Sequence, residues 1–236
     1  MLRKFIVPVI FVVALLILLF LTSKEKSVMK RKISDINEIN YVALGDSYTI
    51  GEGVAMSENY PSFLTAHLQK EGVHITLIAS PSVTGYTAQD LIDQELPVYD
   101  SSNPTFATLL IGANDLAQNI SKDTFQKNVA VILDRMQTKL IKKNKIIILT
   151  IPDFSVTKAG KLFGIGRNLA GEIVEFNHVL KEEARSRNLN VVDITPFSQK
   201  MSDDLTLILQ DGLHPSAKMY KLWEEQLFPV ILKLLT

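Results

Sequence analysis

The stretch INYVALGDSYTIGEG, residues 39–53, places a run of strand-forming residues directly before a serine and two glycines. A strand that ends in Gly-Asp-Ser predicts a tight turn, because glycine and aspartate both favour turns. Ser47 at this turn is either a nucleophile held at a strand end or an ordinary residue at the start of a helix. The first interpretation requires a base, an acid and hydrogen-bond donors from elsewhere in the chain.

Four further apolar runs follow the first one. They lie at residues 73–80, 105–112, 145–151 and 189–194. Amphipathic segments with helical periodicity separate them, and this alternation predicts βαβ units. We therefore expect one α/β domain over residues 37–236, a three-layer α/β/α sandwich with a parallel five-stranded sheet.

The composition narrows the possible functions. The chain has 236 residues, 47% of them hydrophobic, which is enough for one sizeable core. Its 25 basic and 25 acidic residues balance, which argues against a nucleic-acid partner because phosphate contacts need clustered Lys and Arg. With no cysteine, disulfides, thiolate catalysis, zinc–cysteine sites and the lipid-attachment cysteine of a bacterial lipoprotein are excluded.

Residues 1–22 are expected to form a membrane anchor or signal segment. Their apolar run over residues 5–21 is about 17 residues long, at the short end of a membrane span and longer than most signal-peptide cores. No A-x-A-like site follows, which favours an uncleaved, single-pass apolar helix over a cleaved signal that would leave a secreted protein. The polar residues 23–36 then predict a tether.

The orientation of this anchor is predicted from its flanks. Arg3 and Lys4 precede the apolar run, whereas Lys and Arg are more numerous over residues 24–32, a distribution that favours a cytoplasmic domain. A short basic tail before the first apolar run is instead typical of an export signal. We expect a protein of the cell membrane whose domain lies outside the cytoplasm.

Three other polar segments fall where a parallel sheet binds ligands, near the carboxyl ends of its strands. PSVTGYT (81–87) follows the second run, GAND (112–115) follows the third, and DGLHP (211–215) precedes the last helical segment. Asp211 can accept the Nδ1 proton of His214 and leave the other ring nitrogen as a base. Alternatively, Asp211 caps a turn and His214 is a surface histidine.

The remaining candidates each have two interpretations. Asn114 can donate its amide to a developing oxyanion or satisfy nearby backbone groups. Gly85 can offer a bare backbone N–H to the same oxyanion or supply a positive φ before a helix. The other histidines lack comparable neighbours, and we expect structural or solvated roles for them: His67, His74 and His178.

Taken together, ALGDSYTIGEG, VTGYTAQDL, LLIGAND and QDGLHPS resemble the four ordered blocks of the SGNH (GDSL-type) hydrolase family. The resemblance implies a flavodoxin-like fold with Ser47 as the nucleophile, His214 as its base and Asp211 as the group that orients the histidine. It implies an oxyanion hole made of the Ser47 and Gly85 N–H groups and the Asn114 side chain, with no metal or cofactor. The second block departs from the family pattern, because the asparagine that commonly precedes its glycine is missing.

The resemblance implies two-step acyl transfer on a small-molecule or lipid carboxylic ester, of the lysophospholipase or short-chain esterase type. A deacetylase of an acetylated glycan or wall polymer is the alternative within the family. A conventional lipase is disfavoured because Thr49, and not glycine, stands two residues after Ser47, so the G-x-S-x-G elbow is absent. Asp115 is expected to be a buried brace for its loop.

Two interpretations belong to other classes. A metal-dependent phosphoesterase would use as ligands Asp46, Asn114, Asp211 and His214. A catalytically silent, membrane-tethered binding module would use none of this chemistry. Residues 151–168 form either a mobile apolar lid over an acyl pocket or a long loop packed on the domain, through the side chains of Phe154, Leu162, Phe163 and Ile165.

Overall fold

The computed structural model describes residues 38–236, of which Ile39–Thr236 form one compact unit. A sheet of five parallel strands in the order β2-β1-β3-β4-β5 runs through it. The strands are β1 (Ile39–Gly45), β2 (Ile75–Ala79), β3 (Phe106–Leu110), β4 (Ile146–Leu149) and β5 (Asn190–Val192). Each lies within one of the five predicted apolar runs, so the predicted parallel five-stranded sheet is confirmed.

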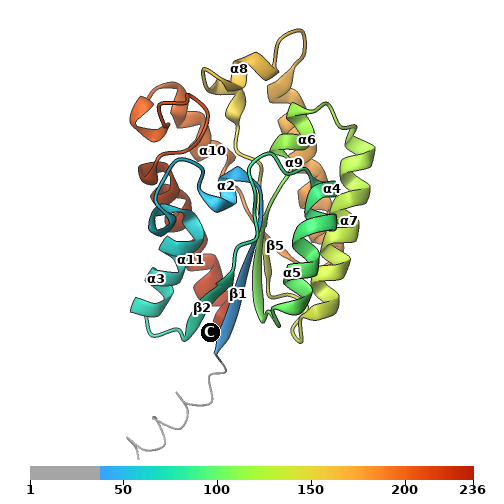
Figure 1. Ribbon diagram of the computed structural model, residues 1–236, viewed down its shortest axis with the longest axis vertical. Helices are drawn as coiled ribbons and strands as arrows, with labels where there is room; N and C mark the ends of the chain where they lie inside the picture. The colour runs from blue at the N-terminus through green and yellow to red at the C-terminus, as the bar shows by residue number, and fades with distance from the viewer. Residues whose placement is uncertain (1–37) are drawn as a thin grey trace, which may run out of the picture. The chain divides into compact units, whose positions relative to one another are not determined.

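Helices cover both faces of the sheet (Figure 1). On one face α3 (Tyr60–Lys70) packs against α11 (Ala217–Leu235). On the other face α7 (Lys122–Lys139) lies between α5 (Leu96–Ser101) and α9 (Leu169–Ser186) and contacts both. The three-layer α/β/α sandwich expected from the alternation of apolar runs and amphipathic segments is therefore the observed fold.

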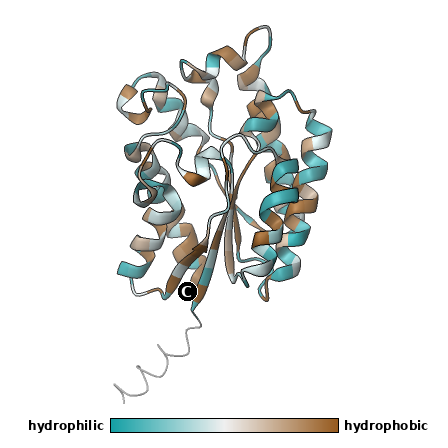
Figure 2. Ribbon diagram, in the orientation of Figure 1, coloured by the Kyte–Doolittle hydropathy of each residue, from teal (hydrophilic) through white to brown (hydrophobic). Residues whose placement is uncertain are grey.

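The burial of the elements explains their sequence patterns. Every residue of β3 and β4 is buried, as expected for inner strands of a parallel sheet that is covered on both faces. The long helices bury one stripe each, and in α7 that stripe is Phe125, Val129, Ile132, Leu133 and Met136. Figure 2 shows the result, with hydrophobic residues concentrated on the strands and polar residues on the outer helix faces.

The strand order reverses next to β1, because the chain passes from β1 to β2 on one side and then to β3 on the other. Such a switch point leaves room for a ligand at the carboxyl ends of the strands. The connections there and elsewhere form short helices: α2 (Ser47–Ile50), η1 (Met56–Glu58), α4 (Ala88–Asp90), η2 (Leu91–Glu95), α6 (Ala113–Ala117), η3 (Phe154–Val156), α8 (Gly160–Phe163), α10 (Thr195–Ser198), η4 (Gln199–Ser202) and η5 (Leu205–Leu207).

Residues 151–168 were expected to be either a lid or a packed loop, and different parts of the segment match each description. Phe154 is buried, as a packed loop requires. Leu162 and Ile165 are 67% and 76% exposed, and Phe163 is 40% exposed. The first part of the segment is thus packed onto the domain, whereas Leu162 of α8 and Ile165 are exposed, and α8 lies near the top of the molecule in Figure 1.

The predicted N-terminal apolar helix, its membrane insertion and the tether fall on residues 1–36, outside the described residues. Over residues 38–236, no helix has the length and hydropathy needed to cross a membrane.

Candidate active site

Ser47 is presented by a turn that only glycine allows. Gly45 ends β1 with φ +155°, and a Cβ placed on it would lie 2.2 Å from the carbonyl oxygen of Leu110. The next residue, Asp46, caps α2 by accepting the Tyr48 N–H at 3.0 Å. Ser47 is therefore the first residue of α2, 6% exposed, at the carboxyl end of an inner strand.

Asp211 and His214 form a hydrogen-bonded pair. Nδ1 of His214 lies 2.7 Å from Oδ2 of Asp211. The other carboxylate oxygen accepts the N–H groups of Leu213 at 2.8 Å and His214 at 3.0 Å. Partial burial raises the pKa of Asp211, but these hydrogen bonds outweigh it, so the pKa lies below its ordinary value. An ionised Asp211 accepts the Nδ1 proton of a neutral imidazole, which leaves Nε2 as the basic nitrogen.

Three N–H donors lie near the serine. Within residues 38–236, the backbone N–H groups of Ser47 and Gly85 have no intramolecular acceptor. One amide proton of Asn114 is donated to the carbonyl of Tyr86 at 3.0 Å, whereas the second makes only a long contact, 3.4 Å, with Asp46. Giving up this long contact for a substrate oxygen that comes within reach of the amide would cost little.

One cavity of about 120 Å³ brings these groups together. Ser47, Gly85, Asn114 and His214 all line it, although they come from four separate segments of the chain. Asp211 stands behind His214, to which it is hydrogen-bonded. The other lining residues are Tyr48, Thr84, Ala113, Ala117, Phe154, Phe163 and Leu213. The structure thus places every candidate residue of the predicted triad and oxyanion hole in or directly behind a single cavity.

Three carboxyl groups are buried beneath this cavity. Burial raises the pKa of Asp46 to about 7, that of Glu95 to about 8 and that of Asp115 to about 6. Asp115 accepts the Ala88 N–H at 2.9 Å, which confirms its predicted role as a buried brace. Glu95 accepts the Gly45 N–H at 3.0 Å and so supports the turn that carries Ser47.

Glu95 was not predicted, although the sequence holds a signal for it. In TAQDLIDQEL, residues 87–96, the apolar stripe runs through Leu91, Ile92 and Leu96, and Glu95 lies on the same stripe. An acidic residue on an apolar stripe is a candidate for burial. Of the other histidines, His67 has a structural role as predicted, with Nδ1 2.7 Å from buried Glu224.

The arrangement suits acyl transfer better than a metal site. Asp46 faces the Tyr48 N–H, and Asp211 faces His214, so these carboxylates are already engaged by hydrogen bonds. Among residues 38–236, no three His, Cys, Asp or Glu side chains are grouped so that they could hold a metal ion.

Comparison with known proteins agrees with this geometry. The model of the GDSL-like Lipase/Acylhydrolase family matches residues 43–222. A curated mouse (Mus musculus) protein, isoamyl acetate-hydrolyzing esterase 1 homolog, is 26% identical over 125 residues, which cover 48% of this chain and 50% of that protein. The chain therefore matches about half the length of this relative.

Two solved structures illustrate the shared fold. The psychrotrophic esterase EstA from Pseudoalteromonas sp., in a structure inhibited by monoethylphosphonate, has a TM-score of 0.65 and 19% identity, over 83% of this chain and 98% of its own. Axe2, an acetylxylan esterase from Geobacillus stearothermophilus, has a TM-score of 0.67 and 17% identity, over 82% of this chain and 94% of its own.

Proposed function

Because the chain belongs to the GDSL-like lipase/acylhydrolase family, we propose that it is a serine hydrolase of carboxylic esters that works through an acyl-enzyme. The observation that carries this proposal is the single cavity lined by Ser47, His214 and the free N–H groups of Ser47 and Gly85. A nucleophile, a base and an oxyanion site within one cavity are what acyl transfer requires.

The first half-reaction forms the acyl-enzyme. Ser47 Oγ attacks the ester carbonyl carbon while Nε2 of His214 takes the hydroxyl proton, and the resulting imidazolium is stabilised by Asp211. The carbonyl oxygen becomes negatively charged and accepts hydrogen bonds from the Ser47 and Gly85 N–H groups and the Asn114 amide. The C–O bond to the alcohol then breaks, and His214 returns the proton to the leaving oxygen.

The second half-reaction repeats these steps with water. His214 removes a proton from water as the water oxygen attacks the acyl carbon, and the same donors stabilise the oxyanion. Collapse of this intermediate expels Ser47 Oγ, which regains its proton from His214. The products are a carboxylic acid, an alcohol and the free enzyme.

The small cavity indicates a short acyl group. Its volume of about 120 Å³, with Phe154 and Phe163 in its wall, suits an acetyl group better than the chain of a long fatty acid. We therefore place the enzyme with short-chain esterases and not with lysophospholipases. Deacetylation of an acetylated glycan or wall polymer fits the same cavity and is supported by the acetylxylan esterase among the structural neighbours.

The test is hydrolysis of p-nitrophenyl esters from acetyl to palmitoyl by the full chain. We expect turnover to be highest for acetate, and we expect Ser47→Ala to abolish it while leaving the thermal unfolding midpoint within a few degrees of the wild type. Near-normal turnover by Ser47→Ala would refute the mechanism. A folded protein that turns over no ester would favour a silent binding module.

We propose further that residues 5–21 anchor the enzyme in the cell membrane, with the domain outside the cytoplasm. The support is the apolar run itself and the short basic tail before it. An anchored chain would remain with membranes after a carbonate wash and be digested by protease added to intact cells. Recovery of the full-length chain in the wash would count against an anchor.

A further inference from the structure

A second cavity lies beside the catalytic one. It has a volume of about 480 Å³ and is formed by residues 156–161, around η3 and α8, and by residues 201–212, around η4 and η5. None of its lining residues is shared with the catalytic cavity. The two segments that form the second cavity are joined by a backbone hydrogen bond, in which the Ala159 N–H donates to the carbonyl of Gly212 at 3.0 Å.

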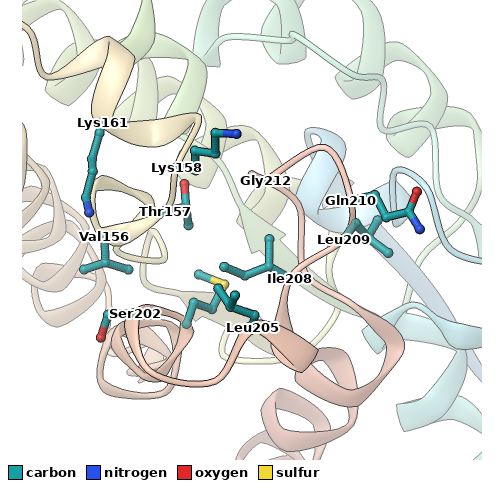
Figure 3. A pocket seen from close by; sticks show the side chains of 11 residues that line it. Val156, Thr157, Lys158, Lys161, Ser202, Leu205, Ile208, Leu209, Gln210 and Gly212 are labelled. Carbon is teal, nitrogen blue, oxygen red and sulfur yellow. The ribbon is translucent and has the colours of Figure 1, made fainter.

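The charged side chains that line this second cavity are all basic. Figure 3 shows Leu205 and Ile208 gathered at its floor, with Lys161 extending from α8 on the opposite side and Lys158 on the rim nearer Gly212. None of the 11 lining residues is acidic. The apolar part of the lining is completed by Val156, Met201 and Leu209.

Both lysines are available to a ligand. Each side chain is exposed, and within residues 38–236 neither is joined to a carboxylate, whereas four other lysines there form ion pairs. Leu205, across the cavity, is 77% exposed. Unpaired cations next to exposed apolar side chains are complementary to a molecule with an aliphatic chain and an anionic end.

We propose that this second cavity is a binding site for a short aliphatic carboxylate. The aliphatic chain of the ligand lies on Leu205, Ile208 and Met201. Its carboxylate accepts hydrogen bonds from Lys161 of α8 and from Lys158 at the rim. Charge-assisted hydrogen bonds of this kind are roughly twice as strong as neutral ones, so the head group sets the selectivity. The proposal concerns a site apart from Ser47 and does not depend on the proposed esterase activity.

The test uses hexanoate and hexylammonium as matched probes of opposite charge, followed by ligand-observed NMR. Hexanoate has a short aliphatic tail and partitions only weakly into neutral detergent micelles. The full-length protein can therefore be tested in detergent. In a Ser47→Ala background, we expect saturable hexanoate binding with a Kd of about 1 mM, and hexylammonium binding at least about tenfold weaker. Equal binding of the two probes would overturn the proposal, since a plain apolar groove does not discriminate charge.

Variants locate the site. The double variant Lys158→Gln, Lys161→Gln should weaken hexanoate binding about tenfold, and Leu205→Asp should abolish it. Lys200→Gln is the matched control, because Lys200 is a nearby lysine that lies over the Phe197 ring and does not line the cavity. Unchanged binding in the double variant, or an equal loss in the control, would overturn the proposal.

A third arm separates the two cavities. Wild-type protein whose Ser47 has been blocked by a small phosphonate should bind hexanoate as the unblocked protein does. Loss of binding after blocking would assign the carboxylate to the catalytic cavity and overturn the second site. If the phosphonate does not react, the proposed esterase mechanism fails, and the lysine variants still decide the second site.

Discussion

At the scale of one residue, the hydrogen bonds of Asn114 leave part of its amide available to a substrate oxygen. Its first amide proton is fixed on Tyr86, and its second has only the long contact with Asp46. We expect Asn114→Ala to lower kcat by about 10²–10³ with little change in KM, because the lost hydrogen bond forms mainly in the transition state. Steady-state kinetics on p-nitrophenyl acetate measure this. An unchanged kcat would remove Asn114 from the oxyanion hole.

Glu95 gives a prediction about stability and pH. Burial is the main cause that raises its pKa from 4.5 to about 8; the negative charge of Asp46 adds to this rise, and the hydrogen bond from the Gly45 N–H works against it. The unfolded chain loses this proton near pH 4.5 and the folded chain only near pH 8, so the wild type loses stability as the pH rises between these values. Glu95→Gln carries no such proton and keeps an oxygen for the Gly45 N–H.

We therefore expect Glu95→Gln to unfold at a temperature about 3–8 °C above the wild type at pH 8, with a much smaller difference at pH 5. Thermal unfolding at the two pH values tests this. Asp115 titrates in both proteins and cancels in the comparison, and the repulsion between Glu95 and Asp46 is removed together with the Glu95 carboxyl. A difference that is the same at pH 5 and pH 8 would show that the carboxyl does not titrate as argued.

At the residue scale, the sequence predicted a role for residues that belong to motifs and gave no role to Glu95, which lies outside them. Ser47, Asp211 and His214 stand in short motifs that each allowed two interpretations, and the resemblance of the four motifs together to one family predicted their roles. The burial of Glu95 depends on η2, a π-helical turn between α4 and α5, and on its contact with the end of β1. The apolar stripe of residues 87–96 marks Glu95 as a candidate for burial, but its hydrogen bond to the turn that carries Ser47 became visible only in three dimensions.

At the scale of elements, α8 and η3 limit the size of the cavity that Ser47 lines. The Phe163 ring meets Phe154 edge-on with centroids 6.2 Å apart, and both rings line the cavity. Phe163 is 40% exposed, so its truncation removes little core packing. We expect Phe163→Ala to enlarge the cavity and to raise kcat/KM for the hexanoyl ester relative to the acetyl ester by about tenfold.

Leu162→Ala is the matched control for this change, because Leu162 belongs to the same helix, is 67% exposed and does not line the cavity. Its acyl preference should equal that of the wild type. If Phe163→Ala also keeps the acyl preference of the wild type, α8 does not limit the length of the acyl group.

The elements differ in how far they could be predicted. The strands repeat a simple pattern of buried apolar residues, and all five were found. The sequence could not decide whether residues 151–168 pack on the domain or form a lid. Phe154, Leu162 and Ile165 are all apolar, yet Phe154 is buried and the other two are exposed. Which apolar side chains of a loop become buried depends on partners elsewhere in the chain.

At the scale of the whole molecule, the sheet order explains why distant segments meet. With β1 between β2 and β3, the loops after these three strands open at one end of the sheet, and the loop before α11 joins them. The meeting of the three loops that follow strands was predictable from a parallel sheet, whereas the loop before α11 follows η5 and was assigned to the site from its motif. The second cavity was not, because it depends on how the loops at 156–161 and 201–212 pack against each other.

The most direct test of the account is labelling by a small serine-directed phosphonate, with the adduct mapped by mass spectrometry. The proposed mechanism predicts one adduct, on Ser47, formed together with the loss of esterase activity and formed far more slowly in His214→Ala. An adduct on another residue, or full activity loss with Ser47 unmodified, would contradict it.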